Sequence, residues 1–269
     1  MTGGNGGADQ PITGTGSGVP RVEAVMGTTV TLDIRDQHLA PAAADRAVAE
    51  AVGILYAADR TFSTYHPDSD ISRLRRDDTS LECCAPQVAE VLDLCAQARR
   101  DTRGWFDPWA MMPGGLDPTG LVKGWAAHNA LRCLAAHGVQ HAMVNAGGDL
   151  VVIGNASGRD DGSGWRTGVA DSGRRDHVID VVHGSDHSVA TSGDYERGPL
   201  AVDPASGEVV RRLAAATIVG PDLAFADAYA TAAMAMGSGA LAWLSRLPGI
   251  RALLITPDGC VLRDRWTMP

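Results

Sequence analysis

Residues 141–154, HAMVNAGGDLVVIG, hold the pattern that decides the fold. Two short runs of apolar and β-branched residues flank Gly147 and Gly148, and each run has the length of a β-strand. A pair of glycines permits a turn with positive φ and also lets another backbone or a ligand approach closely. The pattern predicts two strands joined at the glycines, with Asp149 directly after the turn. An ordinary hairpin without a ligand explains the same residues.

Helices and further strands are expected on both sides of this hairpin. Apolar residues at helical spacing predict helices, whose expected ranges are 41–60, 86–100, 121–137, 225–237 and 239–247. Runs rich in β-branched residues predict strands, whose expected ranges are 22–34 (a strand pair or one bent strand), 165–171, 177–183, 188–193, 214–220 and 250–259. No regular β-α-β repeat occurs among them, which favours an α+β fold over a doubly wound parallel sheet.

Composition and charge exclude several classes of protein. Of the 269 residues, 45% are hydrophobic and 20% are charged, as in ordinary globular domains. The formal net charge of -9 argues against a broad nucleic-acid surface, which needs clustered Lys and Arg. No run reaches the ~20 apolar residues of a membrane helix. Residues 1–20 lack the basic and apolar regions of a signal peptide. We therefore expect a disordered tail over 1–20 and a soluble, cytoplasmic protein without membrane insertion.

The cysteines support the same setting. Their number is odd and no CxxC pair occurs among them: Cys83, Cys84, Cys95, Cys133 and Cys260. We expect reduced thiols, as is usual in the cytosol, and we do not expect a zinc site built from these cysteines.

The segment FADAYATAAMAMG, residues 225–237, places two polar side chains on an apolar helix. Asp227 and Thr231 are four residues apart, so they share one face of the helix. A carboxylate and a hydroxyl that project together from a buried helix need a partner, and a hard cation with oxygen ligands is a suitable one. A capping pattern, or a polar pair bonded to backbone, is the alternative.

The segment GGLDPTGLVKGW, residues 114–125, has features of an anion site. Pro118 and Gly120 predict a turn just before a helix, where free amide donors suit an anion. Lys123 falls in the first helical turn and could meet a phosphate or a carboxylate there. The glycine spacing is not that of a P-loop. A lysine on a solvated helix face is the alternative.

Three further segments are compatible with binding but also with ordinary structure. In SVATSGDYE, from residue 188, small hydroxyls beside a glycine can bond a phosphate, or can simply end a strand. In WFDPW, residues 105–109, aromatics surround Asp107, which core packing would explain equally. In TFSTYHPDSDISRL, residues 61–74, a polar loop opens a helix with Asp70 as the expected N-cap.

Taken in order, these segments resemble the ApbE-like flavin transferases, from about Met26 to Gly259. Seven strings carry the resemblance: MGTTVTL, FSTYHPDSDISRL, LDPTGLVKGWA, VNAGGDLVVIG, SVATSGDYE, VDPASG and ADAYATAAMAMG. Seven strings in one order make it specific. The resemblance implies a single α+β domain over residues 21–269, with a mixed, largely antiparallel sheet packed with helices.

The resemblance also implies an activity and its ligands. Family members bind FAD with Mg²⁺ and move FMN onto a Ser or Thr hydroxyl of an acceptor flavoprotein through a phosphoester bond. The family's metal ligands fall on Asp227, Thr231 and the backbone carbonyl of Gly120. Its FAD contacts fall on Met26, Tyr65, Trp105, Phe106, Asp107, Asp117, Lys123 and Val202, and the segment with Thr191 and Ser192 lines the same cleft.

The sequence departs from the family pattern at two positions. The family usually has a His, the expected catalytic base or orienting group, where GPLAVDPASG places Leu200, and leucine cannot take a proton. Where the family often has Asn after SRL, this chain has Arg75. The catalytic residue therefore stays unassigned, and two alternatives to transfer remain: an FAD-binding homologue that does not transfer, and an FAD pyrophosphatase that releases FMN and AMP.

Overall fold

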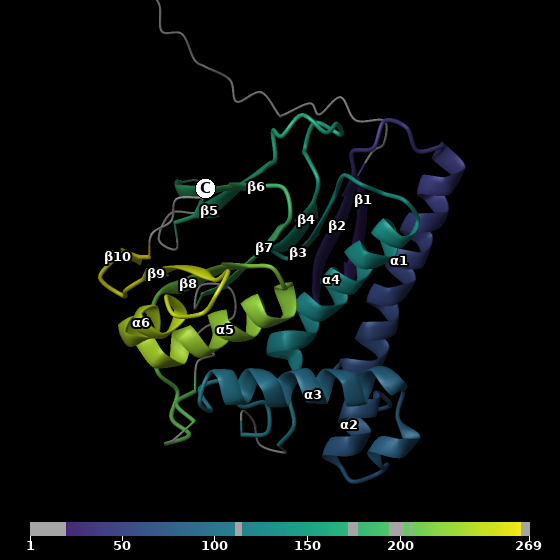
Figure 1. Ribbon diagram of the computed structural model, residues 1–269. Coiled ribbons are helices and arrows are strands. Elements are labelled where there is room, and N and C mark those ends of the chain that lie inside the picture. Colours follow the sequence, from purple (N-terminus) through teal and green to yellow (C-terminus); the bar gives the residue numbers. More distant parts are fainter. Residues whose placement is uncertain (1–19, 111–114, 172–176, 194–201, 205, 265–269) are drawn as a thin grey trace, which may run out of the picture.

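The computed structural model describes residues 20–110, 115–171, 177–193, 202–204 and 206–264 (Figure 1). The expected disordered tail therefore lies outside the described residues, apart from Pro20. Leu200 lies outside them as well. That Leu200 stands where the family usually has a His therefore stays a prediction.

Within these ranges the strands form an eight-stranded antiparallel sheet and a separate two-stranded sheet. The order in the larger sheet is β1-β2-β3-β4-β7-β8-β9-β10, and β5 pairs with β6. The bounds are β1 (Arg21–Val25), β2 (Thr28–Ile34), β3 (Ala142–Ala146), β4 (Asp149–Ile153), β5 (Trp165–Ala170), β6 (Val178–Gly184), β7 (His187–Gly193), β8 (Ala215–Gly220), β9 (Arg251–Ile255) and β10 (Val261–Arg263). The antiparallel pairing and the mixture of helices and strands confirm the expected α+β fold.

The glycine pair forms the predicted turn between β3 and β4. Gly147 has φ 63° and Gly148 has φ 99°, conformations that favour glycine. The β1–β2 hairpin packs closely against this turn, since a Cβ on Gly147 would lie 2.2 Å from Thr28 Oγ1. Gly147 also donates its N–H to the carbonyl of Thr29 at 3.0 Å. The first glycine is therefore required by the close packing of two turns.

The helices cover one face of the larger sheet. Their bounds are α1 (Pro41–Phe62), α2 (Asp70–Arg75), α3 (Pro86–Asp101), α4 (Thr119–Ala136), α5 (Leu223–Met236) and α6 (Ala240–Leu244), with single 3-10 turns at Leu81–Cys83 and Gly237–Gly239. Helix α4 packs on β3 and β4, α5 packs on β7 and β8, and the two helices contact each other (Figure 1). Helix α1 packs against α4.

Both faces of the sheet are buried, so its central strands are apolar on both sides. Along β4, Val151 belongs to the core beneath the helices, whereas Leu150 and Val152 belong to a second core. That second core includes Trp165 and Val182 of the small β5–β6 sheet, which covers the face opposite the helices. All six residues of β8 are buried for the same reason.

Two details of the helix ends differ from the sequence expectation. Helix α4 begins at Thr119, two residues earlier than expected, because the Asp117 carboxylate accepts the Thr119 N–H at 3.0 Å. Ser69, and not Asp70, caps α2: the Ser69 hydroxyl accepts the Ser72 N–H at 3.0 Å. Asp70 instead accepts the Ala85 N–H at 2.8 Å and so ties α2 to the start of α3.

Candidate functional site

The two polar residues of α5 lie where a buried helix crosses α4. Helix α5 is rich in Ala and is capped by Asp222, whose side chain accepts the N–H groups of Ala224 and Phe225. The cap is therefore Asp222, which leaves Asp227 in the helix interior with only 5% of its surface exposed. Thr231 follows one turn later on the same face. The alternative interpretation of Asp227 and Thr231 as a capping pattern is thus excluded.

Gly120, in the first turn of α4, lies directly against Thr231. A Cβ on Gly120 would be 3.3 Å from Thr231 Oγ1 and 3.3 Å from Phe106 Cε2. A side chain at this position would fill the space beside the hydroxyl. Gly120 and Thr231 are therefore neighbours, as the prediction that both belong to one site requires. The Phe106 ring lies beside Gly120 as well and adds an apolar surface there.

Lys123 lies between two buried carboxylates. Its Nζ contacts Asp149 Oδ2 and is 3.9 Å from Asp227 Oδ2. The Lys123 side chain is 27% exposed, and those of Asp149 and Asp227 are 1% and 6% exposed. The interpretation of Lys123 as a solvated surface lysine is therefore wrong. It is also the only lysine in the sequence, and its compact ammonium suits a narrow place between two carboxylates.

Asp149 connects this group to strand β7. Its Oδ1 accepts the Thr191 backbone N–H at 2.8 Å, while Oδ2 contacts Lys123. The Thr191 hydroxyl pairs with the Thr217 hydroxyl at 3.0 Å. Because successive strand residues point to opposite faces, Ser192 lies on the face of Ala190, which belongs to the core beneath the helices. Of the two predicted residues, Ser192 therefore shares the sheet face that α5 covers.

The run at residues 105–107 has a structural explanation for two of its members. Phe106 is 1% exposed and belongs to the core. Asp107 accepts a hydrogen bond from Arg99 Nε at 2.7 Å and another from the Trp109 N–H at 3.0 Å. Aromatic packing thus accounts for Phe106, and an ion pair with Arg99 accounts for Asp107.

Arg212 connects Trp105 to α5, a role that no local sequence pattern indicates. The guanidinium carbon lies 5.4 Å from the centre of the Trp105 ring. The same group donates to Asp203 Oδ2 at 2.6 Å and to the Ala235 carbonyl at 2.7 Å, near the C-terminal end of α5. Val202, directly before Asp203, forms an isolated bridge with Val209. Arginine pairings of this kind depend on tertiary packing and leave no local pattern.

The remaining predicted residues occupy separate places. Met26 forms the turn between β1 and β2, with φ 55°, and packs partly buried against the core. Asp117 accepts both the N–H and the hydroxyl of Thr119, at 3.0 and 2.6 Å. Tyr65 is 90% exposed. The contacts among the described residues unite Gly120, Lys123 and α5, and they do not link Tyr65 to that group.

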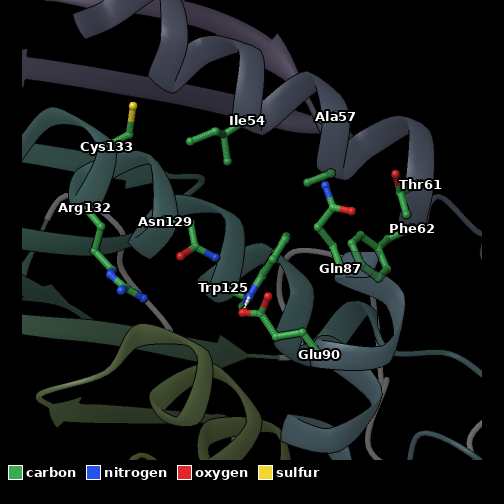
Figure 2. A pocket seen from close by; sticks show the side chains of 11 residues that line it. Ile54, Ala57, Thr61, Phe62, Gln87, Glu90, Trp125, Asn129, Arg132 and Cys133 are labelled. Carbon is green, nitrogen blue, oxygen red and sulfur yellow. Dashed lines mark hydrogen bonds between the residues drawn. The ribbon is translucent and has the colours of Figure 1, made fainter. Parts of the chain in front are cut away.

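An open pocket of about 660 Å³ lies elsewhere, between α1, α3 and α4 (Figure 2). We call it the helix pocket; it is lined by Ile54, Ala57, Ala58, Thr61, Phe62, Gln87, Glu90, Trp125, Asn129, Arg132 and Cys133. In its floor Trp125 Nε1 donates to Glu90 at 2.9 Å. None of the residues predicted for nucleotide or metal binding lines it.

No helix in the described part of the chain has the length and apolar character needed to cross a membrane. All five cysteines are unpaired. The cytoplasmic location expected from them stays a prediction.

Comparison with protein families finds a match to the ApbE family over residues 26–113 and 111–254. Among curated proteins, the chain is similar to the FAD:protein FMN transferase of Treponema pallidum (strain Nichols). The two are 31% identical over 159 residues, which are 53% of this chain and 44% of that protein. It is also 30% identical over 155 residues to the FAD:protein FMN transferase of Rhodobacter capsulatus, over 54% of this chain and 29% of that protein. The chain thus spans less than half the length of both relatives.

Among solved structures, the fold resembles the Pseudomonas stutzeri flavinyl transferase ApbE in its apo form. The TM-score is 0.76 and the sequence identity is 25%, and the match covers 92% of this chain and 95% of that one. The likeness therefore extends over nearly the whole fold described above.

Proposed function

Because the chain belongs to the ApbE family, we propose that it is a Mg²⁺-dependent FAD:protein FMN transferase. In this reaction the hydroxyl oxygen of an acceptor Ser or Thr attacks the FMN phosphorus of FAD. The pyrophosphate P–O bond breaks, AMP leaves, and the hydroxyl proton is released as the phosphoester forms. The names of the two curated relatives support this activity.

The observation that carries the proposal is the convergence of oxygen donors at the crossing of α4 and α5. Asp227 is buried there, Thr231 Oγ1 lies against Gly120, and Lys123 is 3.9 Å from the Asp227 carboxylate. A carboxylate, a hydroxyl and a backbone carbonyl are the ligands that Mg²⁺ prefers. The donor set therefore fits the metal, and we assign it to Asp227, Thr231 and the Gly120 carbonyl.

When bound, Mg²⁺ supplies charge neutralisation at the pyrophosphate oxygens. The chain's own residues position the donors. Asp149 and Asp227 hold the Lys123 ammonium between them, and Asp149 fixes β7 through the Thr191 N–H. Helix α4 begins beside these donors, so the positive end of its dipole and Lys123 together favour a phosphate group.

The FAD-binding residues remain part of the proposal: Met26, Tyr65, Trp105, Phe106, Asp107, Asp117, Lys123, Thr191, Ser192 and Val202. Trp105 has the best physical support as a flavin or adenine contact, because a flat aromatic ring already stacked on Arg212 is held in place. The acceptor flavoprotein and a cytoplasmic setting are also proposals.

Leu200 favours a second candidate function, an FAD-binding homologue that does not transfer FMN. A positioned base typically contributes about 10²–10⁴-fold to a rate, and leucine supplies none. The metal and phosphate features do not depend on this position, so FAD binding is expected in either case.

One incubation separates the candidates. The purified protein is mixed with FAD, Mg²⁺ and a protein that the Treponema pallidum relative flavinylates, and the products are separated by denaturing electrophoresis and chromatography. Flavin fluorescence on the acceptor band supports transfer, and its absence from an acceptor with Ala at the target hydroxyl is the matched control. Free FMN with AMP would instead identify a pyrophosphatase. Bound, unchanged FAD would identify the non-transferring class.

A further inference from the structure

Three metal-binding side chains meet at the end of α4, on the side that packs against α1. Glu50 comes from α1, Cys133 from the last turn of α4, and His137 from the residue that ends the helix. One ligand atom from each lies within 4.8 Å of the other two. His137 Nε2 and Glu50 Oε2 are 2.9 Å apart. We call these three residues the α1–α4 cluster.

The helix geometry explains why the three side chains converge. Cys133 and His137 are four residues apart, so they project from the same face of α4. The His137 N–H closes the helix by donating to the carbonyls of Cys133 and Leu134, at 3.2 and 3.0 Å. Packing of α1 on α4 brings Glu50 to the same place. The backbone positions are therefore fixed by two long helices and not by loops.

The end of α4 also favours a cation electrostatically. The last carbonyl groups of a helix carry the negative end of its dipole, which stabilises positive charge within the last turn. The Glu50 carboxylate adds negative charge at the same point. The helix end and the Glu50 carboxylate therefore both contribute negative charge where the thiol and the imidazole lie.

We propose that the α1–α4 cluster is a Zn²⁺ site, separate from the crossing of α4 and α5 and independent of FAD. One Cys, one His and one Glu form a donor set for a borderline-soft divalent metal and not for Mg²⁺. Three protein ligands leave a fourth position for water. This proposal departs from the expectation drawn from the cysteines alone, because Glu50 and His137 add the other two ligands to a single cysteine.

The distances are compatible with coordination after a small movement. Zinc bonds of about 2.0–2.3 Å place tetrahedral ligands roughly 3.3–3.7 Å from one another. Glu50 and His137 are already closer than this, and their side chains are 62% and 32% exposed. Coordination requires these partly exposed side chains to rotate until the three ligand atoms, now within 4.8 Å of one another, surround one ion.

The metal would join α1 to α4 beside the helix pocket. Cys133 lines that pocket, at the end away from Phe62 and Gln87 (Figure 2). Bound zinc would therefore hold the two helices together at the point where the pocket separates them. Burial, with a smaller contribution from the charge of Glu50, raises the pKa of the Cys133 thiol. Metal binding has to displace the thiol proton, so binding is measured at mildly alkaline pH.

Titration of the purified protein with Co²⁺ tests the proposal. Cobalt bound through a thiolate gives a near-ultraviolet charge-transfer band, whereas cobalt on oxygen ligands at the α4–α5 crossing does not. We expect the band to form with one equivalent of Co²⁺ and to be lost on addition of Zn²⁺. We expect the band to be absent when Cys133 is replaced. We expect Glu50→Gln to weaken Co²⁺ affinity roughly tenfold or more, because loss of a residue that only hydrogen-bonds to a metal ligand already has an effect of that size.

Two variants keep the test decisive. Cys133→Ser is nearly isosteric, and circular dichroism checks that it folds. Cys84→Ser is the matched control, because Cys84 is also half-buried with a pKa raised by burial but lies outside the α1–α4 cluster. A wild-type protein without the band, or a folded Cys133→Ser protein that keeps it, overturns the proposal.

Discussion

Lys123 lies between two carboxylates whose side chains are almost fully buried, Asp149 and Asp227. Removing the positive charge of Lys123 leaves these two carboxylates buried without a compensating charge, which is strongly unfavourable at low dielectric. We therefore expect Lys123 to affect both stability and ligand binding, because it lies 3.9 Å from Asp227, a ligand of the proposed metal site. It also lies in the first turn of the helix expected to face the phosphates.

Replacing Lys123 by Met keeps much of the side-chain stem and removes the charge. We expect the free energy of unfolding to fall by roughly 3 kcal/mol, the lower end of the range for a buried pair, because Lys123 is partly exposed. FAD affinity should also fall and become less dependent on salt. Denaturant unfolding and FAD titrations at two salt concentrations measure both effects. Arg132→Met is the control, since Arg132 is an exposed cation on the same helix. Equal behaviour of the two variants would contradict the assignment.

Leu200 carries the prediction about turnover. If this position supplies the base in relatives, Leu200→His should raise the FMN transfer rate, by up to about 10²–10⁴-fold. FAD affinity should change little. Initial rates on one acceptor measure the effect, with the melting temperature as a check on folding. A wild type as fast as a well-folded Leu200→His protein would show that the base is not needed or comes from elsewhere.

Single residues differed in how far the sequence could predict them. The placement of Asp227 and Thr231 on one buried helix was predictable, because a carboxylate and a hydroxyl are conspicuous among Ala and Met. Lys123 was ambiguous, since the partner that decides its role, Asp149, lies 26 residues away. Arg212 could not be predicted at all, because its contacts with Trp105 and α5 depend on how separate segments pack.

At the scale of elements, the crossing of α4 and α5 positions the proposed site, and Gly124 lets the helices approach. A Cβ at Gly124 would lie 2.4 Å from the Leu223 carbonyl oxygen, a backbone atom that cannot rotate away. The same approach places Gly120 against Thr231. The separation of the two helices therefore depends on both glycines.

Gly124→Ala should push α5 away from α4 and lower the free energy of unfolding by about 1–3 kcal/mol, as overpacking usually does. Gly53→Ala is the matched control within α1, because a Cβ there has nothing within 4 Å. That variant should be neutral or stabilise by up to about 1 kcal/mol through helix propensity. Chemical denaturation compares the two. A Gly124→Ala protein as stable as Gly53→Ala would show that the helices can separate without cost.

Local patterns predicted most elements but not their arrangement. The β3–β4 hairpin follows from its two glycines, and the amphipathic helices follow from their spacing. The pairing of β4 with β7 was not predictable, because partner choice over this distance is set by the packing of both sheet faces. Strand β10, which follows the Pro-Asp-Gly turn, was missed, since its three residues are too few to show a period.

For the molecule as a whole, packing shields two histidines from water: His187 of β7, which is buried, and His128 of α4, which is partly buried. His187 is 5% exposed, and neither of its ring nitrogens has a hydrogen-bond partner among the described residues. Burial lowers the pKa of His187, and burial also lowers the pKa of His128, which accepts the Leu223 N–H. The fold therefore favours the neutral form of both side chains.

These histidines predict acid sensitivity. The unfolded chain takes up their protons near pH 6.5, whereas the folded chain takes them up only at lower pH. Above pH 6.5 both histidines are neutral in the folded and in the unfolded chain, so they do not change the free energy of unfolding with pH. Below pH 6.5 the unfolded chain binds protons that the folded chain does not, so the free energy of unfolding falls as the pH drops. Melting temperatures over this range should show a smaller loss in His187→Leu than in the wild type. An unchanged dependence on pH in that variant would contradict the account of His187.

For the whole molecule, we propose that the crossing of α4 and α5 binds FAD together with Mg²⁺ through Asp227. Calorimetric titration of FAD with and without Mg²⁺ tests this most directly, in the wild type and in Asp227→Asn. Asp222→Asn is the matched control, because it makes the same change on the same helix and asparagine can still serve as the N-cap. We predict that Mg²⁺ strengthens FAD binding in the wild type and in Asp222→Asn. In Asp227→Asn that effect should be lost, because the site's main charge compensation for a hard cation is removed. A folded Asp227→Asn protein with an undiminished response to Mg²⁺ would contradict the claim.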